Sequence, residues 1–350
     1  MSISVTCAKA GRPRRVKTHE NGQHLYTGDV TYDVLHGNLS AFTERVGSTY
    51  KKYATTFGYD AENRPTALNY GSTQDQSTVS YDGLGRVSAK GIKANGHTYS
   101  TAFSFVPGAA AGKTTGLISA ISQAGENFAY TYDDVGNIAS VTHNGKVTAY
   151  SYDPLGQLIR VNDQDDLTSG TSGTTWTYEY DQGGNILSKK RYAYTEAPDL
   201  SGLTPLETDT FTYADSNWKD KLTGYNGSSI TYDAIGNPLN DGTWEYTWVN
   251  GRQLASMRKL DGSLNASFVY NSEGLRVQKT VNGVVTKYIM YGKNISHLIH
   301  DNDELHFFYD AYNNPIIVEW NNGIATTKYT YVRNMLGDII SILDDTGTES

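Results

Sequence analysis

The chain has 350 residues and a formal net charge of −8, from 29 basic and 37 acidic side chains. An acidic chain without a broad basic field does not favour nucleic acid as its main partner. No run of about 18 apolar residues occurs, so no membrane span is predicted, and a single cysteine, Cys7, excludes an internal disulfide or a CxxC metal or redox site.

The aromatic residues are unusually rich in tyrosine, with 27 Tyr against 9 Phe, and 35 glycines accompany 8 prolines. Tyrosine has a flat apolar body and a polar tip, which suits half-buried strand positions. Helical patterns are nearly absent, because few stretches of ten residues avoid glycine or alternation. The composition predicts an all-β chain with on the order of thirty strands joined by tight turns.

A seven-residue phrase that starts with Tyr-Asp recurs along the chain. It reads YDGLGRV at Tyr81–Val87, YDDVGNI at Tyr132–Ile138, YDPLGQL at Tyr152–Leu158, YDQGGNI at Tyr180–Ile186 and YDAIGNP at Tyr232–Pro238, and YNSEGLR at Tyr270–Arg276 is a looser copy. Its spacing is irregular, so the phrase is kept while the strands and loops around it vary.

Each phrase predicts a strand end followed by a turn. The tyrosine ends one strand, and the aspartate opens a type I turn in which its carboxylate accepts backbone N–H groups two or three residues ahead. Pro154 fits the next position because its φ is fixed. Glycine then takes the left-handed conformation and forms a G1 bulge, after which the next strand begins.

Some copies depart from the phrase in informative ways. Tyr59–Pro65 and Tyr309–Pro315 carry asparagine in the glycine position, and asparagine also tolerates positive φ. Tyr32–Leu39 has one extra residue, so its turn should differ, and Tyr213 and Trp248 resemble decayed copies. The residues assigned to repeat turns, all with a structural role, are Tyr59, Asp60, Asn63, Tyr81, Asp82, Gly85, Tyr132, Asp133, Gly136, Tyr152, Asp153, Gly156, Tyr180, Asp181, Gly184, Tyr232, Asp233, Gly236, Tyr270, Gly274, Tyr309, Asp310 and Asn313.

A second set of turns lies between the Tyr-Asp phrases. Asn-Gly or Asp-Gly, the strongest short hairpin signal, begins at Asn21, Asn95, Asn144, Asn226, Asp241, Asn250, Asp261, Asn282 and Asn322. Three longer segments, Pro107–Gly116, Asn162–Thr175 and Glu196–Asp209, are interpreted as hairpin loops, since the same repeats continue on both sides. We therefore expect one repeat region over 1–350, with residues 1–25 set apart as a start that can be irregular, and no separate catalytic domain.

Taken in order, these phrases resemble the RHS/YD-repeat family, which includes bacterial polymorphic toxins, the C component of Tc toxin complexes and the teneurin shell. The resemblance covers Tyr32 to about Asp345 and includes the phrases Trp218–Leu222, Gly251–Leu254 and Tyr331–Asn334. It implies a long antiparallel β-strip that coils into part of a hollow shell around a C-terminal effector. It also implies a self-cleaving RHS-associated core near the shell's end; no copy of that core precedes Ser350.

Four motifs suggest other chemistry but match it poorly. Gly108–Thr114 has only three residues between its glycines, where a phosphate-binding loop needs four, and no strand–loop–helix surrounds it. Ser48 and Lys51 match SxxK, yet a strand would place them on opposite faces. The other two motifs are a histidine group (His297, His300 and His306 around Asp301, Asp303 and Glu304) and an acidic group (Asp163, Asp165 and Asp166). We interpret the first as strand histidines beside a charged hairpin loop, and the second lacks an EF-hand pattern.

Three functions are considered. The leading hypothesis is a structural shell segment of a secreted or surface bacterial protein, with the rest of the shell and its effector as partners. The alternative is an adhesion module whose tyrosine-rich strands bind glycans or surface proteins. An enzyme is the third, and we predict no catalytic, cofactor-binding or metal residues, so that changing Lys113 or Ser48 would abolish no activity.

The chain stops within a predicted hairpin, because Ile339–Thr348 begins one whose return strand is absent. A terminal strand with unpaired backbone groups is expected to pair with another chain. We therefore expect salt-dependent self-association of the chain through a terminal strand.

Overall fold

The computed structural model describes residues 2–7, 12–20, 23–46, 51–71, 74–123, 125–164 and 173–349. All regular structure in these ranges is β-strand, in antiparallel sheets of 19 and 12 strands. This confirms the predicted all-β fold of tandem hairpins. Within the same ranges, no helix has the length and apolarity that crossing a bilayer requires.

In both sheets the strands pair with their neighbours in sequence, as a meander. The first sheet contains β1 (Ser2–Cys7), β2 (Pro13–Glu20), β3 (Gln23–Tyr32), β4 (Leu39–Val46), β5 (Lys51–Tyr59), β6 (Pro65–Tyr70), β7 (Asp75–Tyr81), β8 (Val87–Ala94), β9 (His97–Pro107), β10 (Thr114–Gln123), β11 (Glu126–Tyr132), β12 (Ile138–His143), β13 (Lys146–Tyr152), β14 (Leu158–Asp163), β15 (Thr174–Tyr180), β16 (Ile186–Ala193), β17 (Glu207–Thr212), β18 (Gly224–Tyr225) and β19 (Ser228–Ser229). The second contains β20 (Thr231–Tyr232), β21 (Pro238–Asn240), β22 (Trp244–Val249), β23 (Gln253–Lys259), β24 (Asn265–Tyr270), β25 (Arg276–Val281), β26 (Val284–Tyr291), β27 (Asn294–His300), β28 (Asp303–Tyr309), β29 (Pro315–Asn321), β30 (Thr326–Arg333) and β31 (Ile339–Leu343).

The chain divides into two compact units. Unit 1 contains Met1–Phe103 and Ser267–Ser350, and unit 2 contains Ser104–Ala266. Within the stretch set apart as a start that can be irregular, β1 and β2 form an antiparallel pair whose register shifts between Thr6 and Cys7. Three sequence features, Asn21, Ser48 and the pair Asp165 and Asp166, lie outside the described residues.

The Tyr-Asp turns share one geometry, seen clearly at Asp82. Its Oδ1 accepts the backbone N–H groups of Leu84 at 2.9 Å and Arg86 at 3.0 Å. The bonded residues thus lie two and four positions ahead, where two or three had been expected, because the bulge adds a residue before the ladder resumes at Tyr81↔Val87. The same pair of bonds is made by Asp60, Asp133, Asp153, Asp181, Asp233, Asp310 and Asn271.

Backbone angles at the turns follow the residue types. The predicted positive φ is observed at Asn63 (61°) and Asn313 (63°), as it is at Gly85 and Gly156. In Tyr32–Leu39 the N–H of Asp33 reaches the carbonyl of Asn38, one residue further than in the regular copies, as its extra residue predicts. Both turn residues have positive φ at the Asn-Gly pairs that begin at Asn95, Asn144, Asn226, Asn250 and Asn282, the hairpin geometry that this dipeptide favours.

Several of the phrase tyrosines make a further bond that the sequence did not predict. The Tyr152 hydroxyl donates to the carbonyl of Ile138 at 2.9 Å, and Ile138 is the last residue of the preceding phrase. Tyr81 reaches Pro65 at 2.9 Å, Tyr180 reaches Leu158 at 2.7 Å, the Trp248 indole reaches Pro238 at 2.7 Å and Arg333 reaches Pro315 at 2.8 Å, each again the seventh residue of the phrase before. We name these bonds the turn latches, because each ties one turn to the previous one.

Loops of unit 2 are held by similar backbone contacts. Arg160 of β14 donates to the carbonyls of Thr195 and Ala197, each at 2.7 Å. Thr175, fully buried, receives the N–H of Thr195 at 3.0 Å. β16 pairs with β17 across this loop, as expected for a long hairpin connection.

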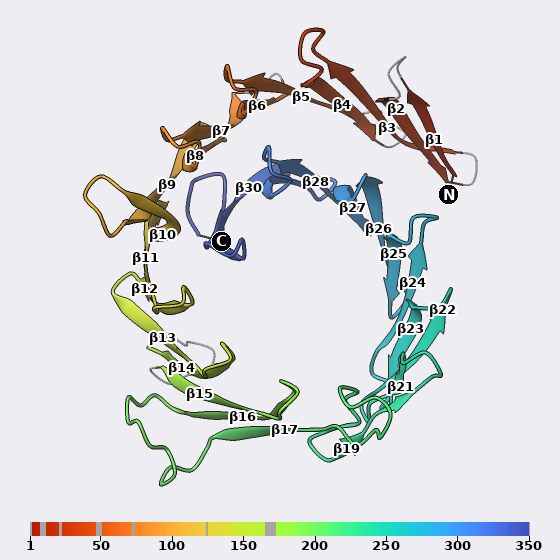
Figure 1. The fold of residues 1–350 in the computed structure, drawn as a ribbon. Helices are drawn as coiled ribbons and strands as arrows, with labels where there is room; N and C mark the ends of the chain where they lie inside the picture. Colours follow the sequence, from red (N-terminus) through yellow and green to blue (C-terminus); the bar gives the residue numbers. More distant parts are fainter. Residues whose placement is uncertain are drawn as a thin grey trace. The chain divides into compact units, whose positions relative to one another are not determined.

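Unit 1 contains two layers that pack face to face. Leu68, Tyr70 and Ala94 of the first layer (β1–β8) form one apolar cluster with Phe308, Ile316 and Ile317 of the second (β25–β31). A second cluster joins Tyr26 and Val46 to Ile289. Figure 1 shows β27, β28 and β30, in blue, alongside the red and orange strands β3–β8. The layers bring together residues more than 200 positions apart.

We expect Gly156→Val to lower the free energy of unfolding by about 1–2 kcal/mol, because a β-branched residue resists positive φ. No atom lies within 4 Å of the position that a Cβ would take at Gly156, so the loss reports on backbone conformation and not on a clash. Asn63→Gly should cost well under about 1 kcal/mol, since glycine adopts this φ readily. Urea unfolding compares the two variants, and equal losses would contradict the turn assignment.

Removing one turn latch should also be measurable. Tyr152→Phe deletes only the hydroxyl and leaves the Ile138 carbonyl without this donor, so we expect a loss of about 1 kcal/mol in urea unfolding. Tyr178→Phe is the matched control, because the Tyr178 ring is half-buried and its hydroxyl bonds none of the described residues. A loss at Tyr178 as large as at Tyr152 would show that the latch contributes nothing specific.

Candidate functional site: a buried polar cluster and cavity

Among the described residues, three of the motifs noted in the sequence do not come together as a site. Gly108–Thr114 makes the tight reversal between β9 and β10, where the N–H of Gly108 reaches the carbonyl of Lys113 at 2.8 Å. Lys51 lies in β5 and pairs with Glu319 at 2.6 Å. Asp163 accepts a bond from Thr148 at 3.1 Å. In the described part of the chain, no group of three or more His, Cys, Asp or Glu side chains could hold a metal ion.

Two of the three histidines that the sequence singled out do come together. His297 of β27 and His306 of β28 are paired across the strands, with their Nδ1 atoms 3.2 Å apart, and both are buried. His300 lies at the end of β27 and contacts Thr286 at 2.8 Å. The charged segment after it is a tight turn in which Asp301 has a φ of 55°.

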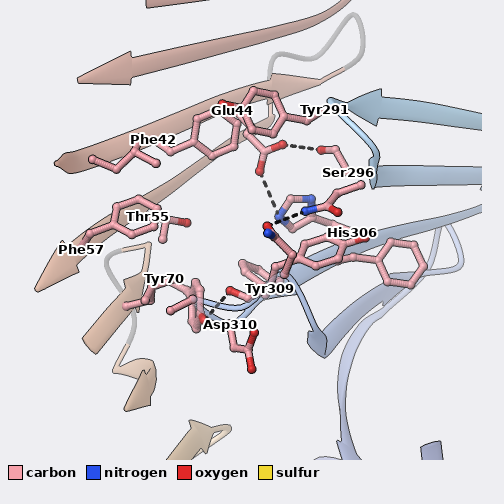
Figure 2. Close-up of a pocket in the computed structure, with 17 residues that line it drawn as sticks. Phe42, Glu44, Thr55, Phe57, Tyr70, Tyr291, Ser296, His306, Tyr309 and Asp310 are labelled. Atoms are coloured by element: carbon pink, nitrogen blue, oxygen red, sulfur yellow. Dashed lines mark hydrogen bonds and ion pairs between the residues drawn. The ribbon is translucent and has the colours of Figure 1, made fainter. Parts of the chain in front are cut away.

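Glu44 and Ser296, which the sequence did not single out, complete a buried polar cluster with these histidines. The Tyr26 hydroxyl donates to Glu44 Oε1 at 2.9 Å, and the Ser296 hydroxyl donates to the same oxygen. Ser296 Oγ is 2.9 Å from His297 Nδ1. Glu44 comes from β4 and Ser296 from β27, so this cluster bridges the two layers of unit 1. Figure 2 shows the Glu44 carboxylate facing Ser296 and His306.

Burial dominates the electrostatics of the cluster. It raises the pKa of Glu44 to about 7, an effect that the donors Ser296 and Tyr26 only partly offset. It lowers the pKa of His297 to about 3, with the nearby Lys51 charge acting in the same direction. The pKa of His306 is also lowered well below its usual value, first by burial and then by His297 and Lys51. Both imidazoles are therefore neutral at physiological pH.

Ser296 and His297 are not arranged as nucleophile and general base. The Ser296 hydroxyl has one proton and donates it to Glu44, so His297 faces the hydroxyl as a donor. An imidazole whose pKa is near 3 is also too weak a base to accept that proton at neutral pH. The serine is 3% exposed, which leaves little access for a substrate at its oxygen.

A cavity of about 250 Å³ lies beside the cluster. Its walls are mainly aromatic and come from both layers of unit 1, as Figure 2 shows. They include Phe42, Phe57, Tyr70, Tyr291, Phe308 and Tyr309, with Glu44, Thr55, Ser296, His306 and Asp310 as polar groups. No lysine or arginine is among the described residues that line it.

Ion pairs surround the cavity and connect the same two layers. Lys51 and the Tyr53 hydroxyl both contact Glu319 Oε1, at 2.6 and 3.0 Å. Lys90 lies 3.2 Å from Asp310, and Lys328 pairs with Asp75. The Tyr53 ring stacks on His306 with centroids 3.6 Å apart. The two layers are thus joined by ion pairs and aromatic contacts as well as by the two apolar clusters, and members of both clusters line the cavity.

Comparison with known proteins gives consistent similarities. A family model described as RHS repeat matches residues 132–168. The tRNA nuclease WapA of Bacillus subtilis strain 168 is 34% identical over 187 residues, which is 50% of this chain, and the tRNA(Glu)-specific nuclease WapA of Bacillus subtilis subsp. natto is 35% identical over 146 residues. The chain spans only 7% and 6% of the lengths of these relatives.

Two solved structures share the fold over almost the whole chain. A chain of the Photorhabdus luminescens Tc holotoxin pore structure with the TccC3-D651A mutation superposes with a TM-score of 0.52 at 14% identity. A chain of the TcdB2-TccC3-Cdc42 crystal structure gives 0.50 at 12% identity. Each match covers 99% of this chain and 23% of the other.

The cluster should make stability depend on pH. At a pH below the ordinary histidine pKa of 6.5, both histidines are protonated in the unfolded chain, whereas His297 and His306 stay neutral in the folded chain. The unfolded chain therefore binds two more protons at these positions, and stability falls as pH falls. Glu44 has the opposite effect, because its pKa is raised in the folded chain. Its contribution to stability is fully present below about pH 4.5 and is lost as pH rises through about 7. Between about pH 4.5 and 6.5 the net difference is one proton, or about 1.4 kcal/mol per pH unit, with stability rising with pH.

Urea unfolding at several pH values tests this dependence. With His297→Gln and His306→Gln combined, only the Glu44 effect of the cluster remains, so the slope in that window should fall below that of the unmodified chain. His36→Gln, at an exposed turn, is the control and should leave the slope unchanged. An unchanged slope in the double variant would contradict the assignment.

Proposed function

This chain is an RHS/YD-repeat protein, and on that premise we propose that it forms part of the wall of a β-shell that encloses a C-terminal effector. The longer protein would be secreted or displayed at a bacterial surface. In this proposal the chain has no catalytic role, and its partners are the rest of the shell and the enclosed effector.

The turn latches are the observation that best supports a wall. They tie successive turns through backbone carbonyls and leave the tyrosine hydroxyls engaged. A glycan-binding surface would need tyrosine side chains that are free on an open face. The engaged tyrosines therefore favour the wall over the adhesion module. The fold shared with Tc toxin chains over 99% of this chain is consistent with the same role.

The matched WapA relatives are named as tRNA nucleases, and we propose a nuclease-type toxin as the parent class. The nuclease would be a separate effector, because the buried Ser296 and His297 do not suit catalysis. The net charge of −8 also does not suit the chain itself for holding tRNA.

Limited proteolysis of the protein with its natural flanking sequence tests the proposal. An enclosed effector domain should resist trypsin while the wall is folded and become sensitive when Tyr81, Tyr152 and Tyr180 are all changed to phenylalanine. Changing Tyr178 alone should leave protection intact. An effector domain that is cleaved equally fast in the unmodified protein would contradict enclosure.

A further inference from the structure

One carboxylate oxygen beside the cavity of unit 1 accepts no hydrogen bond from the part of the chain that the structure describes. Both donors to Glu44, Tyr26 and Ser296, reach Oε1. The contact recorded for Oε2 is His306 Nε2 at 3.9 Å, too long for a hydrogen bond. Glu44 is 8% exposed and lines the cavity, and its Oε2 accepts no hydrogen bond from the described residues. Such a group is costly unless something pairs with it.

Glu44 also has no counter-ion within the described part of unit 1. The lysines nearest the cluster form ion pairs with other carboxylates: Lys51 pairs with Glu319, and Lys328 pairs with Asp75. His306 is fully surrounded by protein and stays neutral, so it provides no positive charge. A buried carboxylate without a cation is a strong site for one, because attraction is poorly screened in such surroundings.

The rest of the cavity suits a cation that carries an apolar body. Seven phenylalanine and tyrosine side chains line it, and ring faces attract ammonium groups. Its 250 Å³ is several times the roughly 30 Å³ that one water occupies in the liquid. A metal ion would need several oxygen or nitrogen ligands, and the described residues contain no group of three or more His, Cys, Asp or Glu side chains that could hold one. An anion would meet two carboxylates, Glu44 and Asp310, and no basic residue in the described lining.

The cavity reaches the surface at the turn edge of the layers. Asn294 and Asn313 line it there, and the Asn294 side-chain amide donates to Asn313 Oδ1 at 3.1 Å. Asn313 is exposed and belongs to the turn Tyr309–Pro315. Two amides at an exposed turn give a polar entrance to an aromatic interior.

We propose that this cavity binds an organic ammonium group on a short alkyl chain, with the ammonium on Glu44 Oε2 and the alkyl chain among the aromatic rings. The group can belong to a free amine or to a lysine side chain of a partner, since the recognised chemistry is the same. The site does not depend on whether the chain forms a shell wall.

Calorimetric titration of the 350-residue chain tests the site with three probes of matched shape. We expect n-butylammonium to bind at least tenfold more tightly than n-butanol, and butyrate not to bind. Between pH 8 and pH 6 the affinity for n-butylammonium should fall about tenfold as Glu44 takes up a proton. Nα-acetyl-lysine methylamide, used as a fourth probe, distinguishes a peptide-borne ammonium from a free amine, and binding of either ammonium probe supports the site.

Glu44→Gln should abolish both the preference for ammonium and its pH dependence. Glu319→Gln is the matched control, because Glu319 already pairs with Lys51, and it should preserve the preference. If Glu44→Gln fails to fold, the comparison of probes on the unmodified chain still decides. Equal affinities for n-butylammonium and n-butanol, or no binding of either ammonium probe, would overturn the proposal and leave a cavity that only water fills.

Discussion

The fold depends on one recurring hydrogen bond, from the side chain that ends a strand to the backbone carbonyl that begins the strand after the previous turn. A meander of short strands has ladder bonds between neighbouring strands, but these bonds do not fix one turn against the next. The turn latch does, because it spans two strands at the edge where the Tyr-Asp turns lie. Each bond contributes only about 1 kcal/mol, yet it recurs along both units.

The latch also explains the tyrosine-rich composition. Phenylalanine would bury the same ring but could not satisfy the carbonyl, which would then be left without that donor. Where tyrosine is replaced, another donor takes its place: the indole of Trp248 and the guanidinium of Arg333 both reach the equivalent carbonyl. The chemistry of donation is therefore kept even where the ring is not.

Local features were predictable from the sequence and distant ones were not. The turn at Asp82 and Gly85 was predictable because the aspartate cap, the bulge and the glycine with positive φ all lie within one seven-residue phrase. The excess of tyrosine over phenylalanine indicated that the hydroxyl groups have a role. The irregular spacing of the Tyr-Asp phrases did not indicate which carbonyl accepts the bond. Nothing local links Glu44 to Ser296, which are 252 positions apart, so the polar cluster could be seen only when the layers were placed together. His297 and His306 were noticed, but their burial follows from that packing.

Native-state hydrogen exchange of the Tyr180→Phe variant tests the latch most directly. Tyr180 donates to Leu158, so its hydroxyl should protect the preceding turn rather than its own. We expect the amides of Gly156 and Gln157 to exchange faster in the variant, while the amide of Gly184, in the turn that follows Tyr180, keeps its rate. Faster exchange confined to Gly184, with Gly156 and Gln157 unchanged, would contradict the claim that the latch couples successive turns.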